Sequence, residues 1–207
     1  MAVALAANCR TGLGTPAGAS DELRITVYDQ AHLPRSLLLN ALDRLRLILQ
    51  QAKISSNPTL GDPADPEASL FLYVALPSSR GEPRMACGAR RDIALKILDS
   101  SPGSLPEGVL GMSSPFALFG LNVRIFNDHI YKAAFRHNLP HATVLPYAIA
   151  HEIGHVLLMG GSHGRRGLMS GVWTEREYQQ MAAGALVFSE DEARMMAANL
   201  GERVCLK

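Results

Sequence analysis

Residues 145–169 read LPYAIAHEIGHVLLMGGSHGRRGLM, and the interpretation of the whole chain starts from this stretch. Pro146 suits the first position of a helix, and Gly160 and Gly161 supply a stop where a left-handed residue can end it. The apolar residues between these points cover most of the circumference of a helix. The sequence therefore predicts a helix of about four turns over residues 145–159, buried on nearly every side.

Three polar side chains interrupt this apolar surface, namely His151, Glu152 and His155. A buried polar group without a partner costs roughly 1 to 3 kcal/mol, so these side chains need partners. Residues four apart lie about 40° apart around the helix axis and about 6 Å apart along it, so both imidazoles can bind one metal ion. Glu152 lies roughly 100° around the axis from His151, where it can reach a metal-bound water without being a ligand. The alternative is a chance HExxH pattern whose histidines form hydrogen bonds in the core.

A catalytic zinc ion typically has three protein ligands and one open position, so a third ligand is expected. His163 follows the two glycines, where the chain can turn back beneath the helix. Glu175 is the alternative, because another class of zinc peptidase takes its third ligand from a downstream glutamate. However, Thr174 and Glu177 form a T-x-x-E capping box that gives Glu175 and Glu177 ordinary roles at a helix N-terminus. We therefore favour His163 as the third ligand.

The segment HEIGHVLLMGGSHGRRGLM resembles the metzincin zinc peptidases, which have HExxH, a glycine turn, a third histidine and a methionine-bearing turn under the metal. It is more similar still to a group of bacterial metzincin-like proteins with a longer spacing before the third histidine. The resemblance implies that His151, His155 and His163 bind Zn²⁺, that Glu152 is the catalytic base and that Met169 forms an apolar floor. Seven residues separate the second and third histidines here, where metzincins usually have five, so the loop geometry is not carried over.

The rest of the chain predicts an α+β or α/β architecture with a mixed sheet, of which we favour α+β. The resemblance implies a metzincin-like sheet with a buried active-site helix and C-terminal helices. Residues 1–20 are expected to form a flexible leader, and residues 21–207 one catalytic domain. Apolar periodicity and capping residues predict strands at 23–28, 70–76 and 122–127, a helix at 37–49, late helices from 174 and 189, and loops at 61–67, 77–83 and 101–107.

Composition limits the partners of the protein. The 207 residues are 47% apolar and carry a net charge of +1, which lacks the positive field that nucleic acid or an anionic membrane requires. No apolar run approaches the roughly 20 residues that span a bilayer. Residues 2–7 could be the tail of a signal sequence but lack a basic n-region, so a secreted or periplasmic location stays open. Cys9, Cys87 and Cys205 support neither a disulfide framework nor a CxxC metal knuckle.

Other charged and polar residues are expected to lie outside the site. Arg165 and Arg166 could select acidic substrate groups, but two adjacent loop arginines are usually exposed. Four further histidines lie in mixed or polar surroundings and are expected to be solvated, namely His32, His129, His137 and His141.

The expected function is zinc-dependent hydrolysis of peptide bonds by an endopeptidase, with Glu152 activating the metal-bound water. The resemblance also implies that the substrate pairs with an edge strand, which we place at residues 109–113 (VLGMS). Two alternatives remain, a non-catalytic zinc-stabilised binding module and a zinc hydrolase acting on a non-peptide amide. The expected partner is a peptide or protein substrate, and the sequence does not indicate an oligomeric state.

Overall fold

The computed structural model describes residues 22–60, 70–75, 92–114, 121–160 and 163–202. The expected leader, the loops at 61–67 and 77–83 and the three cysteines lie outside the described residues. The elements follow in chain order as β1 (Glu22–Asp29), α1 (Arg35–Gln51), β2 (Ser55–Leu60), β3 (Leu70–Ala75), β4 (Asp92–Leu98), β5 (Gly111–Ser114), β6 (Leu121–Phe126), α2 (Asn127–Arg136), α3 (His141–Leu158), α4 (Glu175–Ala183) and α5 (Glu190–Glu202).

The described strands form one mixed sheet in the order β2-β3-β1-β4-β6-β5. The central strands β1, β4 and β6 are parallel to one another. The outer strands run antiparallel to their neighbours, with β3 against β1, β2 against β3 and β5 against β6. β5 therefore forms one edge of the described sheet, and an edge strand presents backbone groups with which another extended chain can pair.

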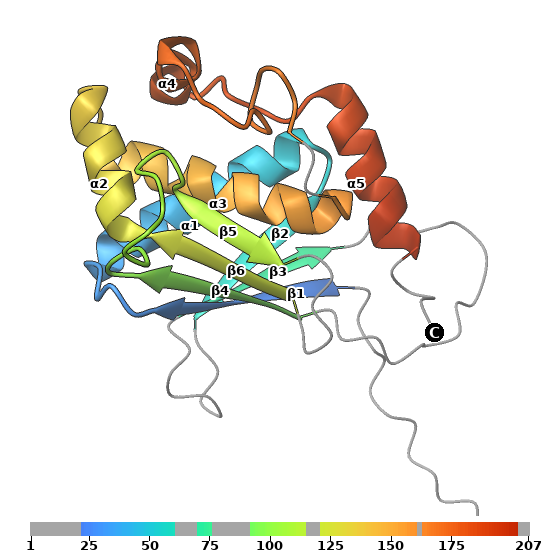
Figure 1. Cartoon of the computed structure of the whole chain (residues 1–207). Helices are drawn as coiled ribbons and strands as arrows, with labels where there is room; N and C mark the ends of the chain where they lie inside the picture. Colours follow the sequence, from blue (N-terminus) through green and yellow to red (C-terminus); the bar gives the residue numbers. More distant parts are fainter. Residues whose placement is uncertain (1–21, 61–69, 76–91, 115–120, 161–162, 203–207) are drawn as a thin grey trace, which may run out of the picture.

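The core lies between one face of the sheet and the helices α1 and α3 (Figure 1). Inward-facing side chains alternate along the central strands, as in Ile93, Leu95 and Ile97 of β4, which are all fully buried. α1 contributes a helical stripe that is buried with them, namely Leu38, Ala41, Leu42, Leu45, Ile48 and Leu49. The architecture agrees with the expected α+β class, in which a mixed sheet is followed by C-terminal helices.

Helix α3 is buried on nearly every side, as predicted, but its ends differ from the prediction. It begins at His141, so Pro146 lies in its second turn and not at its first position. Pro146 is tolerated there because the surrounding core holds the helix in place although one intrahelical hydrogen bond is lost. At the other end Met159, and not Gly160, takes the left-handed conformation, with φ of 52°. The Gly160 N–H then bonds the His155 carbonyl, which ends the helix.

The two late helices begin at the predicted capping boxes. In α4 the Thr174 N–H donates to the Glu177 carboxylate at 2.9 Å. Before α5 the Ser189 N–H donates to the Glu192 carboxylate at 2.7 Å, and the Glu192 N–H donates back to the Ser189 hydroxyl at 3.2 Å. In Figure 1, α4 lies beyond α3 on the side away from the sheet, whereas α5 runs beside the right-hand end of α3.

Candidate metal centre

The structure brings the three predicted histidines together. The Nε2 atoms of His151 and His155, one turn apart on α3, lie 3.1 Å from each other. After the left-handed end of α3 the chain brings His163 back, and its Nε2 lies 3.1 Å from that of His155. One ligand atom from each residue lies within 4.8 Å of the others. These three histidines could therefore hold a single metal ion.

Backbone carbonyls fix the orientation of the two helical imidazoles. His151 Nδ1 lies 2.7 Å from the Leu168 carbonyl, and His155 Nδ1 lies 3.0 Å from the Gly160 carbonyl. A carbonyl oxygen only accepts, so each Nδ1 carries the proton and each Nε2 of a neutral ring presents a lone pair. Burial lowers the pKa of His151 to about 4 and also lowers the pKa of His155, so both rings are neutral at pH 7.

The two nitrogen separations that involve His155 are close to those around one tetrahedral metal ion. Two nitrogens bound about 2.0 to 2.1 Å from zinc lie about 3.3 Å apart in tetrahedral geometry. The observed separation of 3.1 Å between the Nε2 atoms of His151 and His155 is close to that value. Two lone pairs that face each other without a proton repel, and a cation between them removes that repulsion. The donor set, three imidazole nitrogens, is one that zinc prefers.

Glu152 lies beside the three histidines without belonging to the group. Its side chain is buried, and burial raises the pKa of its carboxyl to about 7, while a hydrogen bond with the Ser113 side chain lowers it. Gly111 in β5 allows this placement, because a Cβ atom there would lie 2.7 Å from the Glu152 Cγ atom. Edge strand β5 and helix α3 therefore meet at the Glu152 side chain.

A closed turn carries the chain beneath the histidines. The Gly164 N–H donates to the Met169 carbonyl at 2.8 Å, and the Ser170 N–H donates to the Gly167 carbonyl at 3.1 Å. Gly167 has a φ of 84°, a conformation that favours glycine. Leu168 and Met169 are buried at this turn, and Met169 packs against Gly154, which lies between the two helical histidines.

Two residues that the sequence analysis did not assign support the site. Trp173 donates its Nε1–H to the Leu168 carbonyl at 3.1 Å, so this oxygen accepts from both Trp173 and His151. The indole also packs edge-on against the His151 ring, with centroids 5.5 Å apart. Gly171 lets the chain pass close to His163, since a Cβ atom there would lie 2.9 Å from the His163 Cγ atom. The only signal for Trp173 in the sequence is its position four residues after the turn methionine.

The histidines open into a cleft of about 530 Å³. One wall comes from Pro106 and residues 108–113, which lead into and include β5, and the other from residues 170–173. Exposed apolar side chains stand on both walls, Met112 on the first and Val172 on the second. Apart from Glu152 and the three histidines, no residue that lines this cleft carries a titratable group other than the Tyr178 hydroxyl, among the residues the structure describes.

The alternative third ligand lies elsewhere. The Glu175 carboxylate is exposed at the start of α4 and lies 2.9 Å from His137 Nδ1. It does not belong to the histidine group of the described residues. Arg165 and Arg166 are exposed, as expected.

None of the four earlier histidines belongs to the metal-binding group among the described residues, as expected, but the expectation that they are solvated holds only for His32, which is exposed. It is wrong for His129, which is 2% exposed in α2, and for His141, which is partly buried in α3. His137 stacks on Tyr178, with ring centroids 3.5 Å apart. His129 lies in α2, His137 directly follows α2 and His141 begins α3, so these helices direct the side chains toward neighbouring elements.

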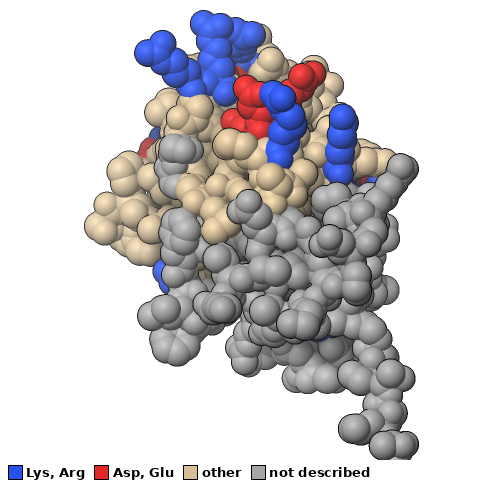
Figure 2. Space-filling model, turned by 90° about the vertical axis from the view of Figure 1, so that its right-hand side faces the viewer, with Lys and Arg blue, Asp and Glu red and all other residues tan. Residues whose placement is uncertain are grey.

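No family model, no curated protein and no solved structure matches this chain. The fold and the site define a mixed α/β domain whose three histidines could hold a metal ion. Along the described ranges, no helix combines the length and the apolar character needed to cross a bilayer. On the face shown in Figure 2, acidic and basic side chains share the upper part of the described surface, in keeping with the small net charge.

Proposed function

We propose that this chain is a zinc-dependent peptidase with a metzincin-like site, acting as an endopeptidase. One observation carries the proposal: three histidine nitrogens and one buried carboxylate meet along a single open cleft. A purely structural zinc site is closed by four protein ligands, whereas three ligands beside a cleft leave a position for a reacting group. The exposure of His163 keeps that position accessible from the cleft.

His151, His155 and His163 would hold the metal through their Nε2 atoms. Bound there, zinc supplies a Lewis acid that lowers the pKa of water and polarises a carbonyl group. The Leu168 and Gly160 carbonyls keep the two helical rings in the tautomer that binding requires. The protein thus presents its ligands already oriented, which reduces the ordering cost of binding.

Glu152 is the proposed base. Its side chain lines the cleft together with both helical histidines and lies against Gly111 of β5. It can accept a proton from the attacking water and pass that proton to the leaving amine. The Ser113 hydrogen bond holds the carboxylate in place for both transfers.

The substrate is proposed to bind in extended form along β5. This strand is the edge of the described sheet and lines the cleft, and it overlaps residues 109–113, where the edge strand was expected. An added strand gains main-chain hydrogen bonds irrespective of its sequence. A peptide bound in this way would pass beside Glu152 and the histidines.

The test is cleavage of a mixed peptide library by zinc-loaded protein, read by mass spectrometry. The matched control is Glu152→Gln, because the amide preserves shape but cannot act as a base. We expect internal cleavage by the wild type and a loss of at least about 100-fold in the variant, with zinc content unchanged. Equal cleavage by the two proteins would remove Glu152 from the mechanism. Tight zinc binding without cleavage of any peptide would favour the non-catalytic binding module. Hydrolysis of small amides alone would favour the non-peptide hydrolase.

A further inference from the structure

The cleft wall at residues 106–113 is an irregular segment over most of its length. Before β5 begins, two backbone hydrogen bonds are found within the described part of the chain, from Val109 N–H to the Pro106 carbonyl and from Phe126 N–H to the Leu110 carbonyl, each at 2.9 Å. Such a segment has little intrinsic stability, so its position depends on side chains that hold it. The same segment leads into Gly111 and Ser113, which contact Glu152.

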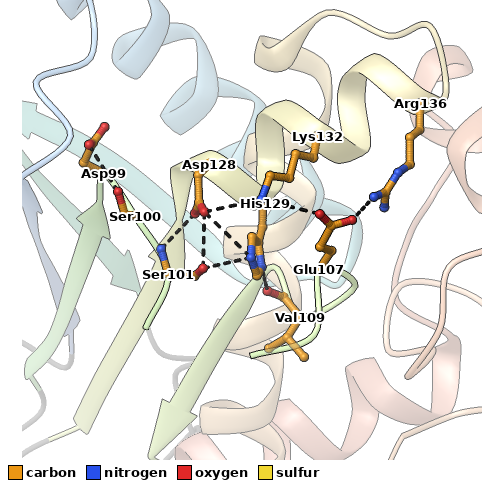
Figure 3. A network of polar contacts seen from close by, with 9 residues as sticks. All are labelled: Asp99, Ser100, Ser101, Glu107, Val109, Asp128, His129, Lys132 and Arg136. Atoms are coloured by element: carbon orange, nitrogen blue, oxygen red, sulfur yellow. Dashed lines mark hydrogen bonds and ion pairs between the residues drawn. The ribbon is translucent and has the colours of Figure 1, made fainter. Parts of the chain in front are cut away.

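A buried histidine holds this segment from behind. His129 lies in the first turn of α2, is 2% exposed, and places its Nδ1 atom 2.7 Å from the Val109 carbonyl (Figure 3). Its Nε2 atom lies 2.8 Å from the Ser101 hydroxyl. Since the Val109 oxygen can only accept, Nδ1 carries a proton whether the ring is neutral or charged. His129 is therefore a donor to the backbone of the cleft wall.

Serine, histidine and aspartate meet here, but not as a nucleophilic triad. In such a triad the carboxylate holds the Nδ1 proton of the histidine, whereas here a backbone carbonyl does. Asp128 instead accepts from the backbone N–H of Ser101 at 2.9 Å and lies 3.2 Å from its hydroxyl. The cluster thus ties residues 101 and 109, the two ends of one loop, to the first turn of α2.

A second, outer anchor joins α2 to the same loop. The Glu107 carboxylate pairs with Lys132 at 3.6 Å and with Arg136, both on α2 (Figure 3). All three side chains are about half exposed, so these ion pairs are screened and contribute little. The buried bond from His129 is the stronger of the two attachments.

We infer that His129 is a positioning residue for the cleft: its bond to the Val109 carbonyl sets where the wall and β5 stand against α3. Through β5, this bond places Gly111 and Ser113 against Glu152. It also fixes the position of the edge along which a peptide would pair. The effect of this hydrogen bond on substrate binding rests on the proposed function, whereas its effect on the position of the wall does not.

The first test uses the wild-type protein and needs no substitution. Nitrogen-15 NMR of the imidazole rings distinguishes the Nδ1–H from the Nε2–H form. We expect His129 to show a protonated Nδ1 whose proton exchanges slowly with water. A ring protonated at Nε2 alone would show that the bond to Val109 is not made, and would overturn the inference.

The second test separates the two hydrogen bonds of the ring. Asn places an amide nitrogen where Nδ1 stands, and Gln places one where Nε2 stands. His129→Asn therefore keeps a donor for Val109, whereas His129→Gln keeps the partner of Ser101 and loses the donor. Ser101→Ala is the matched control, since it removes the Nε2 partner and leaves the Val109 bond.

Amide hydrogen exchange of Val109 and Phe126 gives the readout, with buried amides of α3 as the reference for global stability. We expect His129→Gln to speed exchange of these two amides roughly fivefold or more relative to that reference. His129→Asn and Ser101→Ala should stay within about twofold of wild type. Equal acceleration in all three variants, or none in His129→Gln, would refute the positioning role. If His129→Gln does not fold, the exchange rates of Val109 and Phe126 in His129→Asn decide. Rates equal to those of the wild type support the inference, and faster rates oppose it.

The consequence for substrate is measured separately. Where the wild type cleaves a peptide, His129→Gln should raise KM at least about threefold with a smaller change in kcat, at unchanged zinc affinity. His129→Asn should restore the wild-type KM. If the wild type has no activity, the proposed function is wrong. The hydrogen-exchange result alone then tests whether His129 positions the wall.

Discussion

The Sδ atom of Met169 occupies the position that a side chain at Gly154 would need. A Cβ atom at residue 154 would lie closer to that sulfur than real Cβ atoms approach any neighbour, and 2.8 Å from the Phe188 ring. The glycine of HEIGH is therefore required by the turn methionine that packs against it. This contact ties the helix of the metal centre to the turn beneath it.

Gly154→Ala is expected to destabilise the protein by about 1 to 3 kcal/mol through overpacking, although alanine favours a helix more than glycine does. Urea unfolding measures the change. The matched control is Gly103→Ala, which meets no atom within 4 Å and should be nearly neutral. Combining Gly154→Ala with Met169→Ala should cost less than the sum of the two single changes. Strict additivity would show that the two residues do not compete.

The third ligand can be tested by comparing two alanine variants. His163→Ala should weaken zinc affinity by about 100-fold or more, because a protein ligand is lost. Glu175→Ala should leave zinc affinity unchanged and cost only a few tenths to about 1 kcal/mol of helix stability. Competition with a chromogenic chelator measures both affinities. The reverse order, with zinc lost only in Glu175→Ala, would place the protein in the glutamate-ligand class.

Trp173, the single tryptophan of the chain, should report on the metal centre. Its ring packs edge-on against His151 and its N–H shares the Leu168 carbonyl with that ligand. We expect its fluorescence to change during a zinc titration and to saturate at one equivalent. Trp173→Phe keeps the ring but loses the donor, so zinc affinity should fall about threefold to tenfold. Fluorescence unaffected by saturating zinc would contradict this arrangement.

The stability of the protein should fall in mild acid because of His141. Its Nε2 donates to the Asn127 side chain at 2.8 Å, and its buried Nδ1 has no hydrogen-bond partner within the described ranges. Burial lowers the pKa of His141 from 6.5 to about 4, so between these pH values the unfolded chain binds a proton that the folded chain does not. The stability that neutral His141 gives the folded protein is fully present above pH 6.5, and the free energy of unfolding falls by about 1 to 3 kcal/mol as the pH approaches 4.

His141→Gln isolates this contribution, since its amide can still donate to Asn127 and does not titrate in this range. Urea unfolding of metal-free protein at several pH values should give a flatter profile for His141→Gln than for wild type. The exposed His32 provides the control, and His32→Gln should follow the wild-type profile. Parallel profiles for wild type and His141→Gln would contradict the prediction.

The sequence predicted those parts of the molecule whose signal is local. The HExxH helix, the return of His163 and the capping box at Thr174 each depend on residue types at fixed short spacing, and the structure contains all three. The β2 strand was missed because its sequence, SSNPTL, has neither alternation nor strand propensity, and it forms by pairing with β3. β4 was missed although Ile93, Leu95 and Ile97 alternate.

Contacts between distant segments account for the rest. Helix α2 (NDHIYKAAFR) was not predicted, although its residues Ile130, Ala133 and Ala134 form a buried stripe. No short-range pattern could indicate that His129 meets Val109, since His129 lies twenty positions further along the chain. Likewise, the role of Trp173 depends on its packing against His151, which lies 22 positions earlier in the chain.

The zinc content of the purified protein tests the central claim most directly. Elemental analysis after dialysis, with chelator-stripped and zinc-reconstituted samples measured side by side, gives the number of ions per chain. Three converging histidine nitrogens predict about one zinc per chain, absent after chelation and restored on reconstitution. A folded protein that contains no metal and takes up no zinc after reconstitution would contradict the claim.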